Sequence, residues 1–129
     1  MRFLVMTLTL AAMLVASCRS TSAARDAGVA TIQVEVLGFN DCPHTAEFLK
    51  HVQRAAANIA GARVVYIDQS TLALTDLRRG YPAPTALVHG RDLFGLAAPT
   101  VASLGCRVYP DGLPDEAAIA AVLRMSVDP

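Results

Sequence analysis

The sequence lacks an excess of charge of either sign, since its 129 residues carry 11 basic and 11 acidic side chains. A nucleic acid is bound through a concentrated basic face, so no nucleic-acid partner is expected. Tryptophan is absent, and three cysteines are too few for a scaffold held together by disulfides. The composition therefore argues against both classes of protein.

Long apolar runs are also missing, although 53% of the residues are apolar and the mean hydropathy is +0.41. This hydropathy excludes a disordered, solvated chain. The longest apolar run extends from Phe3 to Ala16, is interrupted only by Thr7 and Thr9, and follows Arg2. It is shorter than the about 20 residues that a membrane-spanning helix needs. A basic start before a short apolar stretch predicts a secretory signal peptide over residues 1–17.

The small residues after this run end in a cysteine. Val15-Ala16-Ser17-Cys18 resembles the bacterial lipobox, which implies cleavage before Cys18 and attachment of lipid to its sulfur and its new amino group. More than one acyl chain, such as palmitate, makes membrane anchoring stable. We therefore expect a cell-envelope protein, lipid-anchored to a membrane and facing the periplasm or the exterior. An ordinary cleaved signal and an uncleaved anchor are the alternatives.

The segment after the lipidated cysteine is small and polar and has no apolar periodicity. Residues 18–30 are therefore expected to be a flexible tether. Such a tether has a root-mean-square span of about 20 Å, which keeps the following domain close to the bilayer. Residues 31–129 are long enough for one modest hydrophobic core. We expect one domain in this segment and a monomeric protein.

The first part of this domain has the pattern of a βαβ unit. Alternation over residues 31–39 predicts a strand, and Pro43 suits the first turn of a helix that Gly61 closes. The more continuously apolar residues 63–67 predict a second, parallel strand covered on both faces. The expected buried stripe of the helix consists of Ala46, Leu49, Val52, Ala56 and Ile59.

The second part of the domain predicts a short helix, a hairpin and a final helix. Residues 70–79 are expected to be the short helix, and residues 85–88 and 92–94 the strands of a hairpin with its turn at 89–91. Pro114, Asp115 and Glu116 form the first turn of a last helix that continues to Met125. The predicted order is β-α-β-α-β-β-α, an α/β fold with a four-stranded mixed central sheet.

This order resembles the thioredoxin fold, with Asp41-Cys42-Pro43 at the start of the first helix and Ala83-Pro84-Thr85 entering the third strand. The runs APTALVHGRDLFG from Ala83 and CRVY from Cys106 look like a group of small bacterial thioredoxin-like proteins, some of which carry an alkylmercury lyase label. The resemblance implies that Pro84 is cis. It also implies that the Ala83 backbone pairs with an extended substrate beside the Cys42 sulfur, so Ala83, Pro84 and Thr85 are the expected substrate-binding residues.

Relatives with oxidoreductase activity have C-x-x-C at this helix start, whereas this chain has Cys42-Pro43-His44-Thr45. A motif with a single cysteine resembles that of monothiol glutaredoxins, whose one cysteine forms mixed disulfides. A helix start favours the thiolate, which is the nucleophile. Pro43, His44 and Thr45 are the residues expected to support the thiolate. The Thr45 hydroxyl could donate a hydrogen bond to the sulfur, and a protonated His44 could add a positive charge beside it. The alternatives are that Thr45 is only a residue of the helix turn, that the His44 side chain is solvated, and that Cys42 is inert.

The third cysteine, Cys106, follows a loop that starts at the Cys42 end of the domain, because the hairpin returns the chain there. We hypothesise that Cys106 approaches Cys42 as a resolving thiol, which an exported location permits. A disulfide requires a Cα separation of about 4.4 to 6.8 Å. The alternative is that Cys106 is a small buried hydrophobe beside Val108.

Together these residues predict thiol–disulfide exchange, with Cys42 and Cys106 as the catalytic residues and no cofactor. The partner would be an exported protein or a small thiol or disulfide. A non-catalytic binding module is one alternative. A binder of soft metals such as mercury or copper is another, since two adjacent thiolates suit such ions. His51 and His89 are expected at the surface, Asp92 and Asp111 are expected in turns, and no metal ligands are predicted from spacing.

Overall fold

Alternating valines place the first strand at the centre of a four-stranded mixed sheet. In the computed structural model, which describes residues 31–127, β1 (Ile32–Gly38) pairs in parallel with β2 (Ala62–Asp68). On its other side β1 pairs antiparallel with β3 (Thr85–Val88), which pairs with the short β4 (Arg91–Asp92). The strand order is β2-β1-β3-β4, and the α/β class with a four-stranded mixed sheet is confirmed.

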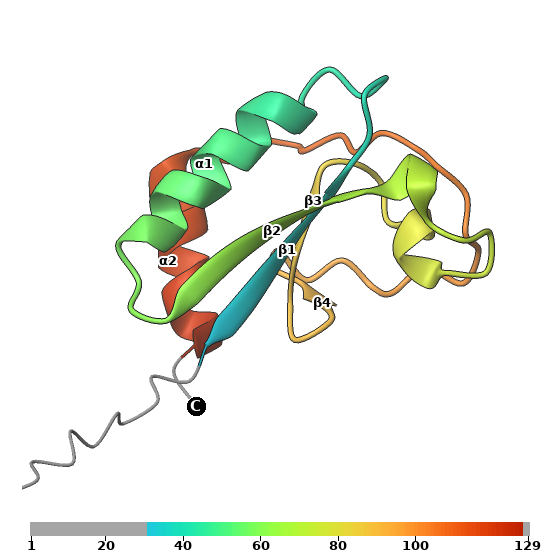
Figure 1. Cartoon of the computed structure of the whole chain (residues 1–129). Helices are drawn as coiled ribbons and strands as arrows, with labels where there is room; N and C mark the ends of the chain where they lie inside the picture. Colours follow the sequence, from blue (N-terminus) through green and yellow to red (C-terminus); the bar gives the residue numbers. More distant parts are fainter. Residues whose placement is uncertain (1–30, 128–129) are drawn as a thin grey trace, which may run out of the picture.

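Both helices lie on one face of this sheet (Figure 1). α1 (Thr45–Ala57) connects β1 to β2, and α2 (Glu116–Val127) follows the long loop after β4 and packs against α1. The parallel βαβ unit and the last helix are therefore confirmed. The buried core on this face includes Val34, Val36, Phe48, Val52, Ala86, Ile119 and Leu123.

The buried face of α1 differs from the predicted stripe. Val52 and Ala56 are buried as expected, and Leu49 and Ile59 are partly buried, but Ala46 is exposed. The face turns instead toward Phe48, which is completely buried. The helix ends at Ala57, so Gly61 is not its cap but part of the turn before β2, with φ 78°. β2 is an edge strand and is only half-buried, which corrects the expectation of two covered faces.

The helix predicted over residues 70–79 is wrong. The chain forms two short 3-10 turns there, η1 (Gln69–Thr71) and η2 (Leu77–Gly80). An aspartate starts each turn: Ser70 N–H donates to Asp68 and Arg78 N–H donates to Asp76. Such side-chain bonds to the backbone compete with a continuous helix. This region covers the opposite face of the sheet, where Leu37, Tyr81 and Leu87 form a smaller buried cluster.

The hairpin is confirmed, but its turn is shorter than predicted. His89 and Gly90 both have positive φ, 53° and 74°, as a two-residue turn that matches the strand twist requires. β4 therefore begins at Arg91, and Asp92 is a buried strand residue rather than a turn residue. Asp111 is exposed in the turn before α2, as expected.

The predicted signal peptide, the lipidated Cys18 and the tether fall in residues 1–30, outside the described residues. Among residues 31–127 no helix is long and apolar enough to cross a membrane.

Candidate functional site

Cys42 lies in the connection between β1 and α1, immediately before the first turn of the helix. Its N–H donates to the Phe39 carbonyl at 3.1 Å, and its own carbonyl accepts from Thr45 N–H at 3.2 Å. Thr45 is the first helical residue, and His44 is the N-cap. Local backbone hydrogen bonds therefore hold the cysteine at the helix start that the sequence predicted.

The Cys42 thiol faces the interior, and only 3% of the residue is exposed. Its Sγ donates to the Ala83 carbonyl, with 3.0 Å between the two atoms. Ala83 belongs to the segment before β3, and the Ala83–Pro84 peptide bond is cis, as the resemblance implies. The buried sulfur and the segment around the cis proline are therefore in direct contact.

Both polar backbone groups of Ala83 are occupied by the chain itself. Ala83 N–H donates to the Gly105 carbonyl at 2.7 Å, and Arg107 N–H donates to the Ala83 carbonyl at 2.7 Å. The two bonds form a parallel bridge between Ala83 and Cys106. The Ala83 backbone groups that were expected to pair with an extended substrate are thus hydrogen-bonded to residues 105 and 107 of the same chain.

This bridge places Cys106 beside Ala83, the residue that the Cys42 thiol contacts. Cys106 is exposed, and both thiols are free. Interaction with the Cys42 side chain raises the pKa of Cys106, and desolvation and the charges of Cys42 and Asp41 raise it further. Both cysteines are therefore positioned at Ala83, and Cys106 is an exposed thiol rather than the buried hydrophobe of the alternative.

A buried ion pair anchors the Cys106 segment, and the sequence analysis missed it. The Arg107 guanidinium donates to the Asp92 carboxylate at 2.7 and 3.2 Å, and the Asp92 side chain is fully buried. Asp92 also accepts from the N–H groups of Phe94 and Leu96, at 3.0 and 2.8 Å. Asp92 is followed directly by the apolar Leu93 and Phe94, and a carboxylate buried beside them requires a basic partner, which is the signal that could have identified the pair.

Tyr109 joins this anchored segment to the core. Its hydroxyl donates to the Pro84 carbonyl at 2.9 Å, and its ring stacks on Phe48 with centroids 5.9 Å apart. The Arg107 guanidinium lies 4.4 Å from the centre of the same ring. Burial raises the pKa of Tyr109, so the phenol stays protonated and available as a donor. The cis proline, the core and the Cys106 segment therefore meet at one side chain.

The three predicted supporting residues do not contact the sulfur as expected. The Thr45 hydroxyl donates to the Phe39 carbonyl at 3.3 Å rather than to Cys42. His44 is exposed and makes no side-chain cap bond, in accord with the solvated alternative, and Pro43 is exposed. The Cys42 side chain donates instead to the Ala83 carbonyl.

Pro84 and Thr85, the remaining expected substrate-binding residues, are buried within the domain. The Thr85 hydroxyl donates to the Pro82 carbonyl at 2.7 Å and accepts from Arg107 at 3.3 Å. Both residues therefore contact the segment that carries Cys106, Pro84 through Tyr109 and Thr85 through Arg107, and neither lies on the surface.

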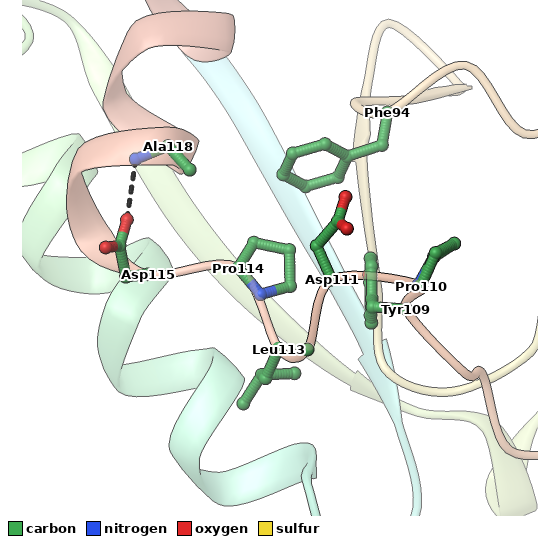
Figure 2. Close-up of a pocket in the computed structure, with 9 residues that line it drawn as sticks. Phe94, Tyr109, Pro110, Asp111, Leu113, Pro114, Asp115 and Ala118 are labelled. Atoms are coloured by element: carbon green, nitrogen blue, oxygen red, sulfur yellow. Dashed lines mark hydrogen bonds between the residues drawn. The ribbon is translucent and has the colours of Figure 1, made fainter.

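Two hollows lie near these residues. A groove of about 300 Å³ on the outer side of Cys42 is lined by Phe39, Asn40, Cys42, Pro43, Thr45, Ala46, Leu49 and Tyr66. A second cavity of about 430 Å³ lies between the rings of Phe94 and Tyr109 and the start of α2 (Figure 2). There Asp115 caps α2 by accepting from Ala118 N–H at 2.8 Å (Figure 2). The second cavity contains neither cysteine, so the groove is the hollow that reaches the sulfur site.

The histidines and acidic residues of the described part do not assemble into a cluster of three or more that could hold a metal ion. The Nδ1 atom of His51 lies 2.8 Å from the Pro114 carbonyl, which joins α1 to the start of α2, and His51 is half-buried rather than fully at the surface. His89 is exposed in the hairpin turn, as expected.

Comparisons of this chain with protein-family models, with curated proteins and with solved structures found no match.

Proposed function

We propose that residues 31–129 form a thioredoxin-like domain that carries out thiol–disulfide exchange through Cys42 and Cys106. The observation that carries this proposal is that two free thiols meet at Ala83, since Cys42 donates to its carbonyl and Cys106 is bridged to it. The βαβ unit followed by a hairpin, the cysteine before α1 and the cis Pro84 beside it support the fold assignment. In this proposal Cys106 supplies the second sulfur that C-x-x-C lacks.

The exchange is a two-electron reaction between two pairs of sulfurs. In the oxidising direction, the Cys42–Cys106 disulfide and a partner dithiol give the reduced cysteine pair and a partner disulfide. Two electrons and two protons pass from the partner to the cysteine pair, and the reverse reaction reduces a partner disulfide. The reaction therefore needs no cofactor.

The surroundings of the pair support both redox states. In the reduced state the Cys42 thiol donates to the Ala83 carbonyl. Oxidation removes that donor, but the carbonyl still accepts from Arg107 N–H at 2.7 Å. Because a buried acceptor without a partner costs about 1 to 3 kcal/mol, this second donor lets the disulfide form without that penalty.

The signal sequence and Cys18 extend the proposal to location. A lipid on Cys18 would hold the domain at a membrane of the cell envelope, facing the periplasm or the exterior, where disulfides persist. The partner would be an exported protein or a small thiol or disulfide. Loss of the lipid mass after Cys18→Ala would support the anchor, and an unmodified Cys18 in the wild type would contradict it.

The exchange is tested on purified full-length protein treated with oxidised glutathione, then alkylated and analysed by mass without reduction. We expect a form lacking two hydrogens, with Cys42 and Cys106 joined in one peptide pair and both protected from alkylation. Cys42→Ser and Cys106→Ser should each abolish this form. Ser103→Ala, an exposed hydroxyl of the same loop, is the matched control and should leave it unchanged. Two freely alkylated thiols after oxidation would contradict the proposal.

A second candidate function follows from the position of both cysteines at Ala83. Two adjacent thiolates with no third ligand suit soft ions that accept two-coordinate geometry, such as Hg(II) or Cu(I). The described residues hold no larger cluster of ligands around the pair. Titration of the reduced protein with either ion distinguishes the candidates, because binding would give a one-to-one complex lost equally in Cys42→Ser and Cys106→Ser. A non-catalytic binding module would show neither the disulfide nor the complex.

A further inference from the structure

The two sulfurs of the proposed pair differ in access to solvent. Cys42 is 3% exposed and its thiol donates to a backbone carbonyl inside the domain. Cys106 is exposed, on an irregular segment that forms an isolated β-bridge with Ala83. A partner sulfur that approaches from solvent therefore meets Cys106 before it meets Cys42.

The Ala83 edge does not offer a partner a route to Cys42. An incoming extended chain would need the Ala83 N–H and carbonyl, but these groups are bonded to Gly105 and Arg107. The segment that bonds them is held by the buried ion pair of Arg107 with Asp92 and by the Tyr109 hydroxyl. Displacing it would separate a fully buried carboxylate from its guanidinium, which is strongly unfavourable.

We infer that Cys106 is the sulfur at which the pair exchanges with outside thiols, and that Cys42 is the internal sulfur. This inference rests on the proposed exchange function and assigns the two roles within it. It reverses the roles expected from sequence, in which Cys42 meets the partner and Cys106 resolves. In this assignment residues 105–107 pair with the Ala83 backbone where an extended substrate was expected to pair, and Cys106 lies where a cysteine of that substrate would lie.

The exchange step starts from the Cys42–Cys106 disulfide. A partner thiolate attacks Cys106 Sγ, forms a mixed disulfide there, and expels Cys42 as a thiolate. A second thiolate of the partner then attacks the partner sulfur of the mixed disulfide and expels Cys106, so the partner is oxidised by two electrons and the pair is reduced. Cys42 and Cys106 each take up one of the two protons that the partner thiols released, which restores the Cys42 thiol that donates to the Ala83 carbonyl.

The first test traps the mixed disulfide. Full-length protein carrying the Cys42–Cys106 disulfide is mixed with reduced glutathione for a short time, quenched with acid, alkylated and mapped by peptide mass. We expect glutathione on Cys106 and the alkyl group on Cys42. Glutathione on Cys42 would overturn the assignment and would indicate that partners enter through the groove beside Phe39 and Tyr66. Failure of the starting disulfide to form would overturn the proposed function itself, so the two failures are distinguishable.

The second test measures access without requiring a disulfide. In Cys42→Ser and Cys106→Ser the remaining thiol is alkylated with iodoacetamide across a pH series, and the rate constants of the two thiolates are compared. Serine preserves the size of the side chain. Cys106 should react at least about tenfold faster than Cys42, because a buried group reacts only when the structure opens locally. Equal rates, or a faster Cys42, would overturn the assignment, and circular dichroism of both variants confirms that each is folded.

Discussion

The segments that carry the two sulfurs are held in place by different kinds of interaction. Cys42 lies between β1 and α1, two regular elements whose apolar side chains form the main core. Cys106 lies in an irregular segment fixed by polar contacts: the bridge to Ala83, the ion pair of Arg107 with Asp92, and the Tyr109 hydroxyl on Pro84. Apolar periodicity positions the first sulfur, and a few paired polar groups position the second.

This difference implies that the two segments respond differently to substitution. A cavity in the core should lower the free energy of unfolding of the whole domain without changing which groups surround Cys106. Removing a polar contact should lower the stability and also loosen the Cys106 segment. Three predictions, in decreasing order of effect, test this distinction, and two smaller ones concern the titration of Cys106.

Leu123→Ala should lower the free energy of unfolding by about 4 kcal/mol, because a completely buried side chain of α2 is lost and a cavity remains. Urea denaturation measures this loss. The rate at which oxidised glutathione forms the Cys42–Cys106 disulfide in the folded variant should stay close to that of the wild type. A large fall in that rate would show that core packing also positions Cys106.

Arg107→Met should lower the free energy of unfolding by about 3 kcal/mol, because it leaves the buried Asp92 carboxylate without its partner. It should also slow formation of the Cys42–Cys106 disulfide, since Arg107 is adjacent to Cys106. Adding Asp92→Asn to this variant should restore part of the stability, because the unpaired charge is removed. If the single variant is as stable as the wild type in urea denaturation, the ion pair does not anchor this segment.

Tyr109→Phe should lower the free energy of unfolding by about 1 kcal/mol, since the hydroxyl that donates to the Pro84 carbonyl is lost while the ring still packs on Phe48. Tyr66→Phe is the matched control. Tyr66 is exposed, so its change in stability should stay within about 0.5 kcal/mol. Equal changes in the two variants, measured by thermal unfolding, would remove Tyr109 from the set of polar anchors.

The smallest effect concerns the titration of Cys106. Its pKa is raised first by the interaction with the Cys42 side chain, so Cys42→Ala should move the midpoint of Cys106 alkylation against pH downward. Asp41→Asn should move it in the same direction by less, because the Asp41 charge is the smallest of the causes. An unchanged midpoint in Cys42→Ala would contradict an interaction between the two thiols.

The same pKa has a consequence for stability. A thiol whose pKa is raised on folding favours the folded state while it is protonated in both states. That contribution is present below the ordinary pKa of cysteine and is lost as pH rises through the raised value. The reduced protein should therefore lose stability in alkaline solution, and Cys42→Ala should weaken this dependence.

Regular elements with a clear apolar period were predictable. The alternation in β1 and the apolar run of β2 indicated a parallel pair, and the pattern at Glu116–Val127 indicated the last helix. The helix expected at 70–79 failed because Asp68 and Asp76 bond to the backbone of the residues that follow them. Local side-chain competition of this kind has no apolar period and was missed for that reason.

The candidate site was predictable only in outline. The helix start located Cys42, and the path of the hairpin indicated that Cys106 would return to the same end of the sheet. Neither argument could reveal that residues 105–107 bond the Ala83 backbone, because hydrogen bonds between backbone groups do not depend on residue type. The partner of Asp92 was equally hidden, since Arg107 is distant in sequence and one of several basic residues.

By itself, then, the amino-acid sequence determined the order of most elements and the presence of a cysteine at a helix start, because these depend on residues that are close together in the chain. Only the tertiary structure decided that the second cysteine is bridged to the residue that the first one contacts, that it is the exposed member of the pair, and that residues 105–107 bond the backbone of Ala83. These features depend on where distant segments meet once the core on both faces of the sheet has formed.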